Sequence, residues 1–258
     1  MKLGEVAYKI FRGQASGKVI KLVELGFFVV PYKGPKQPGL TRYRDLLEAE
    51  YSIEKILSAW ERVKDTGFEW YGVLMGRPSN YLVMVNIDDA ETTRAVEEGR
   101  EQERERILDD LAAKIEKILP KTNVGGLGVA LPTVLQTRTR RGVHILLRLS
   151  KCDYEKLETA LGKANVELGE TEFQGHKLKV ELRIKGATPL ETQYHRTRYW
   201  QLPLPALPLH ALEKLLQSLG IGNLPTSTRE RSCAAEGGKG NRDVQKHIVR
   251  HEEHTLLY

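Results

Sequence analysis

Residues suited to metal chemistry stand at the end of an apolar segment. The run Tyr81-Leu-Val-Met-Val-Asn86-Ile-Asp88-Asp89 is apolar and rich in β-branched residues, which predicts a buried strand. Asn86 and Asp88 share one face of such a strand, because strand side chains alternate with a period of two. Mg²⁺ takes oxygen ligands and keeps several waters, so two or three protein oxygens are enough to bind it. The pattern therefore predicts a divalent-cation site at the end of this strand.

A structural role for the acidic pair is the alternative. Asp88 and Asp89 directly precede a segment with helical character that starts at Ala90. Aspartate is a favoured N-cap residue, since its side chain accepts a hydrogen bond from an unpaired backbone N–H of the first helical turn. The pair therefore fits a helix cap as well as a metal site.

A second predicted strand, over residues 142–150, carries His144 between Val143 and Ile145. Arg138, Arg140 and Arg141 precede it closely, and the guanidinium group suits phosphate oxygens. His144 is therefore a candidate phosphate-binding residue, although a lone strand histidine can equally be structural.

A third predicted strand, over 176–186, carries Glu181. Alternation places Val180, Leu182 and Ile184 on its buried face and Lys179, Glu181, Arg183 and Lys185 on the other. A solvated edge strand would show the same pattern. Glu181 therefore indicates a metal site only in combination with Asp88.

The remaining elements alternate along the chain. Helices are expected over 2–25 (broken near 13–17), 44–65, 90–119, 153–166 and 209–219, and strands over 26–32, 81–88, 129–139, 142–150, 171–186 and 189–202. Residues 137–142 would form a hairpin turn with three arginines at its tip. Lys33 and Lys36 project from a loop over 33–39 whose Pro and Gly residues oppose regular structure.

Composition narrows the possible partners. The chain has 258 residues and a formal net charge of +6, which favours an anionic partner, most commonly nucleic acid. No apolar run approaches the ~20 residues of a membrane span, and the N-terminus lacks the apolar segment of a signal peptide, so a cytoplasmic protein without membrane contact is expected. The two cysteines form no C-x-x-C pair, so no structural zinc is expected.

Two regions are predicted. Residues 1–205 would form one domain, and residues 206–258 a C-terminal helical extension with a polar linker that starts near Pro225. A last helix, over 241–257, has too little apolar surface to be a domain of its own. It is interpreted as the start of a further region, such as a helicase or a helix bundle.

Several short motifs occur in a characteristic order. They are Gly26-Phe-Phe-Val-Val-Pro31, the Lys33-Gly-Pro-Lys36-Gln-Pro loop, Trp60, Gly72-Val-Leu-Met-Gly76, the Asn-Ile-Asp-Asp strand end, Arg141-Gly-Val-His144, Glu181-Leu-Arg-Ile-Lys-Gly186, His195 and Tyr199-Trp200. In this order they resemble the bifunctional primase–polymerase domain of the archaeo-eukaryotic primase superfamily, found in archaeal plasmid and viral replication proteins. The resemblance covers roughly residues 5–205.

The resemblance implies a fold and an activity. The fold would be α/β (α+β), with an RRM-like mixed or antiparallel sheet and packed helices. The activity would be template-directed DNA primase and polymerase, using two Mg²⁺ or Mn²⁺ ions, a single-stranded DNA template, a primer and (d)NTPs.

The resemblance also assigns roles to individual residues. Metal binding and catalysis fall to Asn86, Asp88 and Glu181, and nucleotide binding to His144, Arg141 and Lys185. The positive charges of Lys33, Lys36, Arg138 and Arg140 would contact template or product phosphates.

Two departures from the family pattern keep an alternative open. Asn86 stands where the family has a carboxylate, and Pro189-Leu-Glu-Thr-Gln193 replaces a Pro-Pro-Ser segment. An engineered or natural inactivation, or a weakened but working site, would account for Asn86. The alternative function is a catalytically weakened or inactive nucleic-acid-binding replication initiator with the same fold. A rolling-circle nicking enzyme needs a second histidine next to the first on the strand face, but Leu146 occupies that position.

Overall fold

The computed structural model describes residues 3–11, 14–34, 36–40, 42–63, 67–123, 130–199, 204–222 and 224. The chain divides into two compact units, Met1–Ser227 and Thr228–Tyr258, and all described residues belong to the first. The predicted linker and the predicted helix over 241–257 lie outside the described residues.

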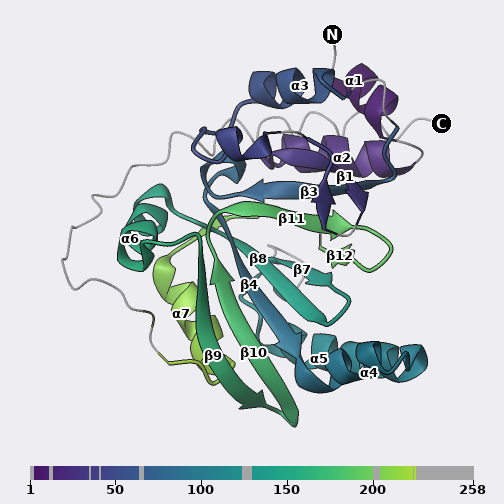
Figure 1. The fold of residues 1–258 in the computed structure, drawn as a ribbon. Coiled ribbons are helices and arrows are strands. Elements are labelled where there is room, and N and C mark those ends of the chain that lie inside the picture. Colours follow the sequence, from purple (N-terminus) through teal and green to yellow (C-terminus); the bar gives the residue numbers. More distant parts are fainter. Residues whose placement is uncertain are drawn as a thin grey trace. The chain divides into compact units, whose positions relative to one another are not determined.

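A large antiparallel sheet forms the centre of the first unit (Figure 1). Its strands are β12 (Arg196–Arg198), β7 (Leu135–Arg138), β8 (Gly142–Leu149), β4 (Leu82–Asp89), β10 (His176–Arg183) and β9 (Asn165–Phe173), in this spatial order. The short strand β13 (Ala206–Leu207) pairs in parallel with β8.

Helices cover one face of this sheet. The helices α5 (Glu101–Ile118), α6 (Lys151–Leu161) and α7 (Leu209–Ser218) bury their apolar stripes against it, and α4 (Ala90–Glu97) precedes α5. Val83, Val85 and Ile87 of β4 belong to this core, together with Leu111 of α5 and Leu215 of α7. The intervening residues of β4 therefore point to the opposite face of the sheet.

A smaller antiparallel sheet lies with the N-terminal helices. It contains β11 (Gly186–Glu191), β3 (Trp70–Met75), β1 (Val29–Gly34) and β2 (Gln37–Pro38), in that spatial order. The helices α1 (Leu3–Ile10), α2 (Gln14–Glu24) and α3 (Ile53–Glu61) share its core. Short 3₁₀ helices occupy Tyr43–Leu46 and Arg77–Ser79, and a two-stranded sheet joins β5 (Lys121–Asn123) to β6 (Ala130–Pro132).

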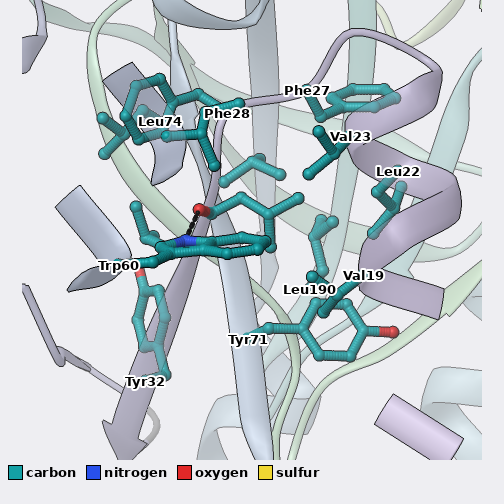
Figure 2. Packing of buried hydrophobic residues seen from close by; sticks show 14 of the residues in the cluster. Val19, Leu22, Val23, Phe27, Phe28, Tyr32, Trp60, Tyr71, Leu74 and Leu190 are labelled. Atoms are coloured by element: carbon teal, nitrogen blue, oxygen red, sulfur yellow. Dashed lines mark hydrogen bonds between the residues drawn. The ribbon is translucent and has the colours of Figure 1, made fainter. Parts of the chain in front are cut away.

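Trp60 is at the centre of the N-terminal core. Figure 2 shows it among Phe28, Tyr32 and Leu74, with its indole nitrogen donating to the carbonyl oxygen of Val29 at 2.9 Å. Trp60 is fully buried, so this bond satisfies the only polar group of its side chain.

The described residues thus form a mixed α/β structure with antiparallel sheets and seven α-helices, which confirms the predicted class at that level. Among them, no helix is both long and apolar enough to cross a membrane.

Several element predictions differ from the structure. The helix expected over 90–119 is two helices, because Gly99 adopts a left-handed φ of 70° between them. The helix expected over 44–65 is reduced to a 3₁₀ turn and α3. The strand expected over 171–186 is a hairpin of β9 and β10 that starts at Asn165.

The domain boundary also lies further along the chain than residue 205. β13 pairs with β8, and α7 contributes Leu212, Leu215 and Leu216 to the core under the large sheet. The first unit therefore needs these residues to bury the helical face of its sheet.

Candidate active site

Three strands place the predicted metal and nucleotide residues side by side. In the register of β4, Asn86 is directly opposite His144 of β8 on one side and Glu181 of β10 on the other. Because directly opposed residues project to the same face of a sheet, all three side chains share a face. Asp88 lies on this face too, two residues beyond Asn86. This is the face opposite to helices α5, α6 and α7.

The two aspartates at the end of β4 have different roles. Asp89 is fully buried and caps α4, accepting hydrogen bonds at 2.7 Å from both the backbone nitrogen and the hydroxyl of Thr92. Its other carboxylate oxygen lies 3.3 Å from Nδ1 of His176. The helix-cap explanation is therefore correct for Asp89, and Asp88 is left on the candidate site face.

Glu181 is bound by two neighbouring side chains. Its Oε2 accepts from Nδ2 of Asn86 at 3.4 Å, and from Nη2 and Nε of Arg183 at 2.7 Å and 3.1 Å. The ion pair is partly exposed, with 34% of the Arg183 side chain and 27% of the Glu181 side chain accessible. Arg183 is a site residue that the motif assignment missed, although its place two residues after Glu181 on an alternating strand already predicts a shared face.

The ionisation of Asp88 is opposed by its surroundings. Burial, and then the neighbouring Glu181 carboxylate, raise the pKa of Asp88, while a hydrogen bond from Asn86 and the charges of Arg141 and Arg183 act in the other direction. Two carboxylates that repel each other in a partly buried place are a favourable setting for a divalent cation, which would relieve both effects.

The side chains on this face offer oxygen ligands, which hard divalent cations prefer. Among the described residues no group of three or more His, Cys, Asp or Glu side chains is arranged to hold a metal ion. The candidate set instead has two carboxylates, Asp88 and Glu181, and the carboxamide of Asn86. Mg²⁺ and Mn²⁺ accept such a small set because water completes their coordination shell.

His144 is buried beneath the small sheet. The residue is 8% exposed, and its Nδ1 lies 3.4 Å from the hydroxyl of Thr188 on β11. The ring of His195 is near it, with the two centroids 5.8 Å apart. Burial, followed by the charges of His195 and Arg183, lowers the pKa of His144 well below its ordinary value, so the ring is neutral at pH 7.

His195 is the second buried histidine at this place. Its Nδ1 lies 2.7 Å from the hydroxyl of Thr192, and its pKa is lowered to about 4 by burial and by the charges of Arg196 and Lys36. The motif comparison contains His195 but gave it no role, because its position in the chain did not show that it packs against His144.

Gly142 allows the strands to come close beside Asp88. Gly142 pairs with Asp88 in the register of β8 and β4, and a methyl group on it would come within 1.8 Å of the Ile87 carbonyl oxygen. The backbone N–H of Asp89 donates to the carbonyl of Arg141 at the same place, at 3.0 Å. A residue without a side chain is therefore required there.

The three arginines of the hairpin are not together at its tip. Arg138 lies within β7 and pairs with Glu105 and Asp109 of α5, at 2.8 Å and 2.6 Å. Arg140 is exposed, and its guanidinium lies 4.9 Å from the ring centre of Tyr194. The expectation of a three-arginine tip was wrong for Arg138, because carboxylates on α5 hold its side chain.

The three lysines predicted to bind nucleotide or DNA lie in different surroundings. Lys185 is held by Glu48 and Glu158, each at 2.6 Å, so its ammonium is already engaged by two carboxylates. Lys33 and Lys36 are exposed on β1 and just before β2. The charge of Lys36 contributes to the lowered pKa of His195.

Comparisons with known proteins add no assignment, since no family model matches the chain and no curated protein is similar to it in sequence.

Proposed function

We propose that this protein is a cytoplasmic template-directed DNA primase and polymerase, with its active site at Asn86, Asp88, Glu181 and His144. The observation that carries the proposal is the direct lateral register of His144, Asn86 and Glu181 on three neighbouring strands, with Asp88 on the same face. Residues far apart in the sequence thereby come together in the combination that the primase–polymerase resemblance implies.

The order of elements supports an RRM-like, primase-like core. Apart from α4, the β5–β6 pair and the edge strand β9, the chain passes from β4 through α5 to β7 and β8, and then through α6 to β10. These four strands lie in the order β7-β8-β4-β10. These elements follow the β-α-β-β-α-β order of split β-α-β folds, with α5 and α6 on one face of the sheet and the candidate site on the other.

Asp88 and Glu181 are the residues that would hold the divalent cations, and Asn86 would contribute its carboxamide oxygen. When bound, such ions lower the pKa of an attacking 3′-hydroxyl and stabilise the leaving pyrophosphate. The raised pKa of Asp88 is consistent with a carboxylate whose charged form needs a nearby cation.

His144 would contact the nucleotide as a neutral group. Since burial keeps its imidazole uncharged, it would supply a hydrogen bond and not a positive charge to the phosphates. Arg141, whose charge already reaches Asp88, would add positive charge at the same end of the site.

Single-stranded DNA would bind along the exposed cations Lys33, Lys36 and Arg140. Tyr194 lies under the Arg140 guanidinium and adds an aromatic surface on which a base can stack. Arg138 is not included, because its guanidinium is paired with α5.

The test is extension of a primer and de novo priming on single-stranded DNA with labelled nucleotides and Mn²⁺ or Mg²⁺. The proposal requires metal-dependent, template-directed incorporation that is lost in Asp88→Asn. A matched control is Asp109→Asn, which changes a carboxylate on α5 and should keep the activity.

A specific observation favours a second candidate, a non-catalytic nucleic-acid-binding module. Glu181 already receives hydrogen bonds from Asn86 and Arg183, so its charge is compensated without any metal ion. DNA binding by wild-type protein without incorporation under either metal would support this candidate.

A further inference from the structure

Arg183 is a cation within the candidate site to which the motif comparison gives no role. It lies two residues after Glu181 on β10, on the same face, and forks onto one oxygen of the carboxylate through Nη2 and Nε. Both partners are partly exposed, and such ion pairs are weakly held in water. The guanidinium is therefore able to exchange Glu181 for a better partner.

The charge of Arg183 reaches the rest of the site. In the register of β10 and β4, Arg183 is directly opposite Met84 and Glu181 is directly opposite Asn86, so Arg183 lies on the site face beside the Glu181 carboxylate. Its charge favours the charged form of Asp88 and disfavours the charged form of His144. The charge of Arg183 therefore acts both on the proposed metal ligands and on the residue proposed to contact the phosphates.

Among the described residues, the other cations of this face are placed differently: Lys179 is directly opposite Asp88 and pairs with Glu167 at 3.0 Å, and the charge of Arg141 acts on Asp88. His144 is neutral, and Lys185 is held away by Glu48 and Glu158. A nucleoside triphosphate brings several negative charges, and a planar guanidinium binds phosphate oxygens through two parallel hydrogen bonds. Arg183 is a guanidinium that can bind these phosphates, and it lies on the same strand as Glu181.

We propose that Arg183 is a triphosphate-binding residue that holds Glu181 until a divalent cation and a nucleotide arrive. With a divalent cation bound, the Glu181 carboxylate would be a ligand of the ion, and the Arg183 guanidinium would be free to pair with the incoming phosphates. The two events are then linked, since each makes the other more favourable. This inference rests on the proposed polymerase function.

The test compares Arg183→Gln with wild-type protein and with Lys177→Gln, which removes an exposed charge from the same strand and face, four residues from Glu181. Binding is measured for Mn²⁺ alone and for inorganic tripolyphosphate in the presence of Mn²⁺. Arg183→Gln should bind Mn²⁺ alone more tightly, because the competing guanidinium is gone. It should bind tripolyphosphate roughly tenfold or more weakly, the effect of one lost charge-assisted contact.

The conservative variant and the control separate this role from a structural one. Arg183→Lys should recover part of the tripolyphosphate affinity, since it keeps the charge and loses the fork, and Lys177→Gln should behave as wild type. Unchanged tripolyphosphate binding in Arg183→Gln, or weaker binding of Mn²⁺ alone, would overturn the inference while leaving incorporation by the wild type intact. Failure of the wild type itself to bind tripolyphosphate and to incorporate nucleotides would remove the proposed function, and this inference with it.

Discussion

Asn86 donates through Nδ2 to Oε2 of Glu181 across the β4–β10 pair, at 3.4 Å. The carboxamide also hydrogen-bonds Asp88, so one neutral side chain contacts both carboxylates of the candidate site. An aspartate at this position would place a third negative charge between them. Compared with an aspartate at the same position, Asn86 therefore lowers the need of the site for cations.

The first prediction concerns that charge. Asn86→Asp should melt at a lower temperature than wild type in the absence of divalent cations, because like charges repel in a partly buried site. Mn²⁺ should restore its stability by more than it stabilises the wild type. Thermal melting with EDTA and with Mn²⁺ measures both effects.

In the extension assay, Asn86→Asp should also incorporate nucleotides faster than wild type, most visibly with Mg²⁺. Asn165→Asp, at an exposed position on β9, is the control for a general effect of added charge. A variant with unchanged melting and unchanged incorporation would show that position 86 takes no part in cation binding.

The second prediction separates two arginines of the β7–β8 hairpin. Arg140→Ala should weaken binding to single-stranded DNA and reduce the slope of log affinity against log salt by ~0.7, the effect of one phosphate contact. Arg138→Ala should leave the slope unchanged, because Arg138 pairs with Glu105 and Asp109. Titrations from low to moderate salt decide the matter. Equal slopes for wild type and Arg140→Ala would remove Arg140 from the DNA surface.

The third prediction follows from the lowered pKa of His195. An ordinary histidine in the unfolded chain has a pKa of 6.5, and His195 in the folded protein has a pKa of about 4. The unfolded state therefore binds more protons between these values, so stability is highest above pH 6.5 and is lost as the pH falls toward 4. This histidine alone should cost about 2 kcal/mol of unfolding free energy between pH 7 and pH 5.

Denaturant unfolding at several pH values measures this dependence. His195→Asn should be less sensitive to acid than wild type, although His144 keeps part of the effect since its pKa is lowered in the same direction. His210→Asn, at an exposed position on α7, should retain the full dependence. An identical pH dependence in wild type and His195→Asn would contradict the buried, neutral state of this ring.

The site-bearing strands could be predicted from sequence because their signal is local. Alternation with a period of two placed Asn86 with Asp88, and Glu181 with Arg183, on common faces before any strand pairing was known. The lateral order of β8, β4 and β10 follows from long-range pairing, which alternation does not specify.

Other residues could not be placed from the sequence, since their positions depend on distant partners. Lys185 is engaged by Glu48, which is 137 residues away in the chain, and Arg138 by carboxylates about thirty residues away on α5. His195 joins His144 only because β11 and the segment after it fold over the large sheet. The role of α7 was also missed, because its apolar stripe does not reveal which sheet it covers.

The most direct test of the central claim is single-turnover incorporation of a labelled nucleotide onto a primed single-stranded template, compared between wild type and Glu181→Gln. Glu181→Gln keeps the size of the side chain and removes its charge, and Glu167→Gln on the neighbouring strand β9 is the matched control. The account predicts Mn²⁺-dependent incorporation by wild type and by Glu167→Gln, and a loss of at least about a hundredfold in Glu181→Gln, as expected when a group that stabilises transition-state charge is removed. Incorporation by Glu181→Gln at the wild-type rate, or none by the wild type with either metal, would contradict it.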